Sequence, residues 1–199
     1  TKHRWSYSPK KYWTIGADYE FYGAYPYEQG YKFDQNTKFY TLKNFTVNSD
    51  TTKMVDLMIA ERNLATANNT VELMFHHILS NVNFMAKVSN DVDTSEVTSV
   101  DVISFDVKGL LSTGDYQQTG WASNHEPVGK WTNDMDKFYT FPAYGNGKAL
   151  ALPVAGHPES GLVTNLLMMP QTLFYVDDAE AKVSAKQDPT IEVKFKVSY

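Results

Sequence analysis

Residues 191–198 read IEVKFKVS, and this stretch decides the fold class. Four apolar residues, Ile191, Val193, Phe195 and Val197, alternate with charged or polar ones. Successive side chains of a β-strand point to opposite faces of its sheet, so a period of two predicts a strand. The pattern predicts one buried and one solvated face, as in an antiparallel sheet that packs on a core.

Three further segments show the same alternation, namely residues 71–75, 82–88 and 100–107. They are rich in β-branched or aromatic residues and are bounded by turn-forming residues, which is typical of strands. In the last segment, the alternation puts Val102 on the opposite face from Phe105 and Val107. Residues 54–64 have some helical spacing but are a short run. Strands separated by about a dozen residues with turns between them favour an all-β antiparallel sandwich.

The composition is that of a folded protein with a hydrophobic core. The chain has 199 residues, of which 42% are hydrophobic and 21% charged, and this composition excludes a disordered protein. The absence of Cys excludes a disulfide scaffold, a thiolate zinc site and a cysteine nucleophile. The formal net charge of -5, without a basic run, argues against nucleic acid as a partner, because phosphate binding needs clustered Lys and Arg.

The composition changes near residue 65. Residues 65–70 read ATANNT, a small and polar segment of the kind that links domains, and most tyrosines precede it. The part that follows is long enough for a nearly complete sandwich domain. Residues 1–66 are too few for a second sandwich of that size, so we expect half a domain or a subdomain packed on the second part.

Five segments, in order, resemble the fimbrillin family, the β-sandwich surface proteins of anaerobic Gram-negative bacteria. The most telling reads VELMFHHILSNV at 71–82, where a strand, Phe-x-His, Leu-Ser and a second strand follow one another. The other four are YW with YEFYGAYP at 12–13 and 19–26, VDLMIA at 55–60, residues 100–107 with Gly109, and LLMMPQ at 166–171. Motif residues expected to be structural are Trp13, Phe75, His76, His77, Pro170 and Gln171.

The resemblance implies a transthyretin-like antiparallel β-sandwich with two domains, the first incomplete. Residues 1–66 would be the later part of an N-terminal β domain, and residues 67–199 a C-terminal β-sandwich domain lacking its final strand or strands. The expected function is that of a non-enzymatic fimbrial or cell-surface subunit, as pilin, anchor or tip adhesin. Such subunits assemble by donor-strand exchange, in which a strand of one subunit completes the sheet of the next.

The resemblance also implies partners and a location. Expected partners are other fimbrial subunits, together with a host protein or a glycan. The expected location is the cell surface, in the outer membrane or a fimbrium. Because the family is exported as lipoproteins, a lipid anchor is expected on the precursor, although the chain contains neither a signal peptide nor a lipobox Cys.

Aromatic residues are the best candidates for a ligand or adhesion surface. Their rings can stack on sugar faces, and Tyr adds a hydroxyl group. The candidates are Trp121, Trp131, Tyr139 and Tyr144 in a loop-rich region, and Tyr25 and Tyr27 in an earlier run. A surface carbohydrate-binding lipoprotein on the same fold is therefore the alternative function. The competing interpretation of these rings is a core or a face between domains.

Other motifs point to structure rather than chemistry. His76 and His77 are adjacent on a strand and so point to opposite faces, which predicts turn capping rather than a shared metal ion. Residues 90–96 (NDVDTSE) have the oxygen density of a calcium loop but lack its central Gly and its final Glu, so we expect a solvated turn. Asp50-Thr51-Thr52 resembles a short O-glycosylation triplet used by such bacteria. No catalytic residue, metal site or cofactor is predicted.

Overall fold

Alternating apolar and polar residues form strands through most of the chain. The computed structural model describes residues 8–9, 11–64, 71–144, 149–171 and 189–199, which contain strands, two short 3-10 turns and no α-helix. The strands are β1 (Tyr19–Tyr25), β2 (Lys32–Asp34), β3 (Phe39–Thr46), β4 (Met58–Leu64), β5 (His76–His77), β6 (Ser80–Ala86), β7 (Ser99–Leu111), β8 (Thr113–Trp121), β9 (Pro127–Asn133), β10 (Phe138–Tyr144), β11 (Leu150–Leu152), β12 (Ser160–Met168) and β13 (Thr190–Ser198). The turns are η1 (Tyr27–Gln29) and η2 (Thr51–Lys53). The predicted all-β antiparallel class is confirmed.

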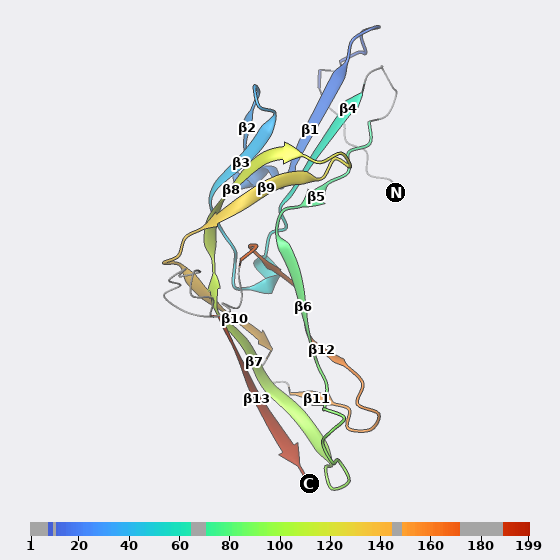
Figure 1. Cartoon of the computed structure of the whole chain (residues 1–199), viewed down its shortest axis with the longest axis vertical. Helices are drawn as coiled ribbons and strands as arrows, with labels where there is room; N and C mark the ends of the chain where they lie inside the picture. Colours follow the sequence, from blue (N-terminus) through green and yellow to red (C-terminus); the bar gives the residue numbers. More distant parts are fainter. Residues whose placement is uncertain (1–7, 10, 65–70, 145–148, 172–188) are drawn as a thin grey trace, which may run out of the picture.

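The strands build two sandwiches that lie end to end along an elongated molecule (Figure 1). The upper sandwich packs a sheet of order β1-β4-β5 against a sheet of order β2-β3-β8-β9. Leu42, Leu57 and Ile59 are almost completely buried in the core between them. Tyr40 and Leu42, two residues apart on β3, both belong to this core, because successive side chains of a strand point to opposite faces.

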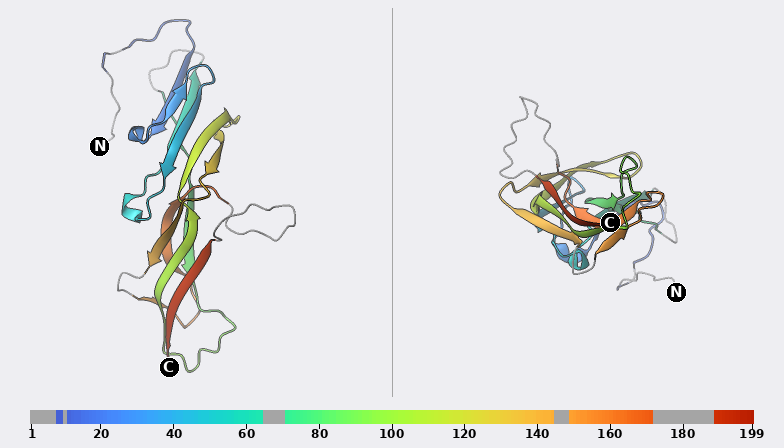
Figure 2. Two further views of the ribbon diagram at one scale, coloured as in Figure 1. Left: turned by 90° about the vertical axis from the view of Figure 1, so that its left-hand side faces the viewer. Right: turned by 90° about the horizontal axis from the view of Figure 1, so that it is seen from below.

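The lower sandwich packs the β12-β6 pair against a sheet built around the long strand β7. Asp106 of β7 pairs with Pro142 of β10 and with Glu192 of β13, so these two strands lie along opposite edges of β7. Phe105 and Phe141 are buried in the core of this sandwich. Figure 2 shows β7 and β13 side by side along the lower sandwich, with the C-terminus at its far end.

Strands β7 and β8 carry the chain from the lower to the upper sandwich almost without interruption. β7 ends at Leu111 and β8 begins at Thr113, with Ser112 between them. The side chain of Gln171 braces this junction. Its Oε1 accepts a hydrogen bond from the Leu111 backbone N–H at 2.8 Å, and its Nε2 donates to the Leu111 carbonyl at 3.3 Å. The predicted motif residue Gln171 thus lies where the two sandwiches meet.

The upper sandwich contains strands from both sides of the predicted linker. β8 and β9 follow residue 66, yet they complete the sheet of β2 and β3, which precede it. One sheet therefore crosses the predicted boundary. The linker segment 65–70 lies outside the described residues, and the division into domains of 1–66 and 67–199 stays a prediction.

Two β-bulges in β7 change which residues face the lower core. Lys194 of β13 pairs with Ser104 of β7, and the next residue, Phe195, pairs with Val102. Ile103 of β7 therefore has no partner on β13 and is the extra residue of a bulge. Val102 and Phe105 both face the core as a result, and the prediction that they lie on opposite faces is wrong. Further along β7, Gly109 adopts a φ of +74°, which glycine does without steric penalty, at a second shift in register.

Residues 71–75, predicted as a strand, form none, and the chain pairs with β4 only at β5 (His76–His77). Leu73 and Phe75 instead lie against Gly23 of β1, where an added Cβ would come within 2.8 Å of the Phe75 ring. The alternation in this segment therefore reflects side chains packed on a sheet rather than a strand within one.

Candidate functional site

The inner face of β13 departs most from the predicted burial. Ile191, Val193 and Phe195 point to the same side of their sheet as their β7 partners, which belong to the lower core. They are nevertheless 48%, 43% and 63% exposed. The predicted buried face of residues 191–197 is therefore wrong for this structure, although these apolar residues do share one face.

The exposure follows from the unequal widths of the two facing sheets. β12 contacts β10, and β6 lies over β7, where the rings of Phe84 and Phe105 are 5.1 Å apart. The β12-β6 pair therefore covers β10 and β7, which are two of the three strand positions in the opposite sheet. No described strand lies opposite the third position, which β13 occupies. Within the described part of the chain, the inner face of β13 is therefore only partly covered.

An apolar groove of about 90 Å³ lies between β6, β7, β12 and the beginning of β13. Its walls include Val82 and Phe84 of β6, Leu110 of β7, Met168 of β12 and Ile191 of β13, and its lining residues carry no charge. Among the described strands, β6 pairs only with β12. The groove is thus bordered by an edge of β6 that no described strand occupies, and such an edge can take up an extended segment.

The outer face of β13 is charged and solvated. Lys108 of β7 donates a hydrogen bond to Glu192, which lowers the pKa of that carboxyl, and Lys194 lies 3.6 Å from the same side chain. Both side chains of the Lys108–Glu192 pair are substantially exposed, so the pair contributes little to stability. A partner chain would therefore gain the most binding free energy by covering the apolar side of β13.

The aromatic candidates do not gather on one surface. Tyr25 and Tyr27, at the end of β1 and in η1, are 48% and 86% exposed. Tyr139 packs against both cores, and burial raises the pKa of its hydroxyl to about 12. Trp121 is half-buried against the upper core. The backbone of Tyr144 pairs with Phe105, and its side chain lies outside the described part of the structure.

Trp131 lines a second cavity, called the upper pocket here, of about 350 Å³. Its lining residues are His77, Ile78, Tyr116, Pro127, Gly129, Lys130, Trp131 and Pro170. The pocket lies where β5, at the edge of one sheet, approaches β9, at the edge of the other. Its walls are more polar than those of the apolar groove. Trp131 is the one aromatic candidate among its lining residues.

The remaining motif residues hold local structure. The Trp13 ring meets Tyr19 edge-on at a centroid distance of 4.6 Å. His77 Nδ1 lies 2.8 Å from Asp56 Oδ2, so the partner of this imidazole is a carboxylate side chain. His76 Nε2 is buried and has no hydrogen-bond partner within the described residues. The Pro170 carbonyl accepts a hydrogen bond from Asn133 Nδ2 at 3.1 Å.

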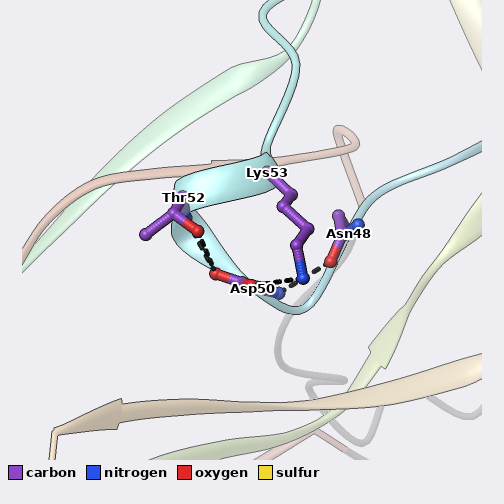
Figure 3. A network of polar contacts seen from close by, with 4 residues as sticks. All are labelled: Asn48, Asp50, Thr52 and Lys53. Carbon is purple, nitrogen blue, oxygen red and sulfur yellow. Dashed lines mark hydrogen bonds and ion pairs between the residues drawn. The ribbon is translucent and has the colours of Figure 1, made fainter.

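The triplet Asp50-Thr51-Thr52 forms the capped turn η2 (Figure 3). Asp50 Oδ1 accepts hydrogen bonds from the backbone N–H and the hydroxyl of Thr52, at 3.0 and 2.7 Å. Its Oδ2 lies 2.9 Å from Lys53 Nζ, and its own N–H donates to Asn48 Oδ1. These bonds, led by that of the Thr52 hydroxyl, lower the pKa of Asp50 to about 2. The geometry accounts for the triplet as an N-cap.

The acidic loop at 90–96 contains local turns. Asp93 Oδ1 accepts a hydrogen bond from the Ser95 backbone N–H at 3.0 Å, which lowers the pKa of this exposed carboxyl. Within the described parts of the chain, no three His, Cys, Asp or Glu side chains are placed to hold a metal ion.

A pair of side chains that no sequence motif predicts joins the two sheets of the upper sandwich. Glu61 of β4 is only 8% exposed, and its Oε1 lies 3.1 Å from Nδ1 of His125. His125 has a φ of +64° in the turn between β8 and β9, so the pair joins the tip of that hairpin to the opposite sheet. The two residues are 64 positions apart in the chain, and no local pattern connects them.

A family model described as Fimbrillin-like matches residues 1–197. The chain belongs to the fimbrillin-like family. A search of the curated proteins found no match, and neither did a search of the solved structures. The assignment of the chain to the fimbrillin-like family thus rests on the family model, and the resemblance stated from the sequence is confirmed.

Membership in this family makes the chain a fimbrial structural subunit of the cell surface, which assembles with other fimbrial subunits. The family is generally non-enzymatic. Among the described residues, no helix has the length and apolar character of a membrane span.

Proposed function

We propose that this fimbrillin-like subunit assembles by accepting an extended strand of a neighbouring subunit beside β6, opposite β13. The observation that carries the proposal is the exposure of Ile191, Val193 and Phe195 on the inner face of their sheet. An exposed apolar face on a strand invites association with another chain. In a fimbrial subunit, such a face can serve as the joint.

The arrangement of the two facing sheets in the lower sandwich determines where an incoming strand would fit. A third strand added to the β12-β6 sheet would hydrogen-bond to the edge of β6 that no described strand occupies, and it would lie over β13. Its inward side chains, two residues apart, would meet Ile191, Val193 and Phe195 and close the apolar groove. Its outward side chains would continue the surface of β6, where Asn81, Asn83 and Met85 are exposed. We therefore expect a donor of alternating apolar and polar residues.

Several finer features belong to the same proposal. They are a transthyretin-like topology, a lipid anchor on the precursor and an outer-membrane location. The apolar groove supports strand acceptance.

Disulfide trapping can test the joint, because the chain contains no Cys of its own. A Met85→Cys variant puts one thiol on the outer face of β6, beside the expected donor. Paired in turn with single Cys residues introduced along a candidate donor strand of a co-purified fimbrial subunit, it should cross-link most strongly at the donor position directly opposite residue 85, because a disulfide needs Cα atoms within about 7 Å. Gln117→Cys, on the interior strand β8, is the control and should give none. Equal cross-linking by both variants, or none by Met85→Cys, would refute the assignment.

A further inference from the structure

We propose that the upper pocket binds a saccharide. This inference goes beyond strand acceptance and is independent of it, because the upper pocket and the apolar groove lie in different sandwiches. The volume of about 350 Å³ falls within the range of about 300–1,000 Å³ typical of small-molecule sites.

The indole of Trp131 provides a fixed aromatic wall. Its Nε1 donates a hydrogen bond to the Ile78 carbonyl at 2.7 Å, which ties β9 to the residue that follows β5. The ring also packs against Tyr116 and Phe45, at centroid distances of 5.4 and 6.0 Å. Trp131 remains half-buried, so part of the indole is accessible. A ring held in place before binding loses little conformational entropy when a ligand arrives.

Glycine at 129 lets a phenol reach the same pocket. Tyr116 is 3% exposed, and its hydroxyl end lies over Gly129 on the neighbouring strand. A Cβ on residue 129 would come within 2.4 Å of Tyr116 Oη, so any other residue would displace the phenol. Tyrosine thereby adds a polar group beside the indole of Trp131.

His77 completes the polar lining. Asp56 Oδ2 lies 2.8 Å from His77 Nδ1 and so orients an imidazole whose side chain is 62% exposed. That contact leaves Nε2 as the ring nitrogen available to a ligand. An imidazole nitrogen can donate or accept according to its tautomer, which suits a ligand hydroxyl group.

The chemistry of the walls selects the ligand class. A lipid would leave the polar groups of the pocket without partners, which is costly. The described residues hold no cluster for a metal ion. For a phosphate, the pocket offers a single lysine, Lys130, and no helix N-terminus. An aromatic wall beside a phenol, an imidazole, the Lys130 ammonium group and two prolines matches a molecule with apolar C–H faces and many hydroxyl groups. A saccharide has this combination.

Saturation-transfer NMR of the full chain can test the proposal with glucose, galactose, mannose, fucose, N-acetylglucosamine and sialic acid, followed by a glycan array. We expect contact with at least one sugar, and an affinity at least fivefold lower in His77→Ala and in Trp131→Phe. Trp121→Phe, outside the pocket, is the matched control and should bind as the unmodified chain does. Because His77 is largely exposed, its variant keeps the test valid even where Trp131→Phe lowers stability.

Two results would overturn the saccharide site. One is silence toward every sugar on both platforms. The other is binding that neither His77→Ala nor Trp131→Phe weakens, since the sugar would then lie elsewhere. Cross-linking at Met85→Cys should be the same in all these variants, so a failure of this proposal is distinguishable from a failure of strand acceptance.

Discussion

The substitution Phe195→Ser separates a surface that awaits a partner from a surface that stabilises the subunit itself. Complete burial of a Phe side chain contributes about 1.5–3 kcal/mol. Phe195 is 63% exposed in the free subunit, so about 1–2 kcal/mol remains to be gained when a strand covers it. We therefore expect the variant to lower the free energy of unfolding of the isolated chain by less than about 1 kcal/mol. Strand uptake should weaken by about 5–30-fold.

Two measurements on the same variant provide the comparison. Urea denaturation of the isolated chain reports the free energy of unfolding. The fraction of the variant incorporated into purified fimbriae, in competition with the unmodified subunit, reports assembly. Lys196→Ser is the matched control, because it makes the same replacement one residue along, on the outer face of β13. It should change the free energy of unfolding by no more than about 0.5 kcal/mol, as is usual for surface substitutions. Its incorporation into fimbriae should equal that of the unmodified subunit.

Two outcomes would refute the reasoning about β13. If Phe195→Ser destabilised the isolated chain by several kcal/mol, as truncation of a buried Phe does, the inner face would already be covered in the free subunit. If Phe195→Ser and Lys196→Ser were incorporated equally well, the inner face would play no part in assembly. Only the combination of a stable monomer and impaired incorporation fits strand acceptance beside β6.

Two further predictions concern stability. Gly129→Ala should lower the free energy of unfolding by about 1–3 kcal/mol, because its Cβ would lie 2.4 Å from the Tyr116 hydroxyl. In the control Gly120→Ala, the nearest neighbour of the added Cβ is 3.9 Å away, so the loss of stability should be smaller. Equal losses of stability in urea denaturation would contradict this account. The pKa of Asp50 in the folded chain is lowered to about 2, below its unfolded value of about 3.9, so its stabilisation is complete above about pH 4 and is lost as the pH falls toward about 2. The unfolding midpoint should therefore fall more steeply between about pH 4 and pH 2 for the unmodified chain than for Asp50→Asn, and parallel curves would rule out this role for the carboxylate.

The fold class could be predicted from the sequence because alternation is a local property. The segment 82–88 corresponds to β6, in which Val82, Phe84 and Ala86 turn inward while Asn83 and Met85 are exposed. No distant residue is needed to specify that pattern. The same local logic accounts for the correct grouping of the apolar residues of β13 on one face.

Bulges limited the prediction of individual core residues. Leu42 and Phe45 of β3 both enter the upper core although they are three residues apart, and Asn44 between them has a φ of +53°. A spacing of three contradicts the period of two and resembles a helix instead. Such an insertion becomes visible only when the partner strand is known, because the ladder defines which residue is extra.

The candidate site could be predicted only in part, for a related reason. Trp131 was among the candidate aromatic residues, but Tyr116 and Gly129 were not. Their relation is a diagonal contact between strands β8 and β9, and it depends on a register that is absent from the sequence pattern. The pairing of Glu61 with His125 likewise depends on how two sheets face each other.

The inner face of β13 shows what a strand pattern can and cannot specify. Alternation separates Ile191, Val193 and Phe195 from the charged residues between them, and the structure places the two sets on opposite faces. Whether the apolar set is buried depends on what lies opposite, and among the described strands of the lower sandwich the facing sheet ends at β6. Under the proposed function, the missing cover belongs to the neighbouring subunit. The buried face predicted from residues 191–197 would then be correct for the assembled fimbria and wrong for the isolated chain, which is why the incorporation of Phe195→Ser is the decisive measurement.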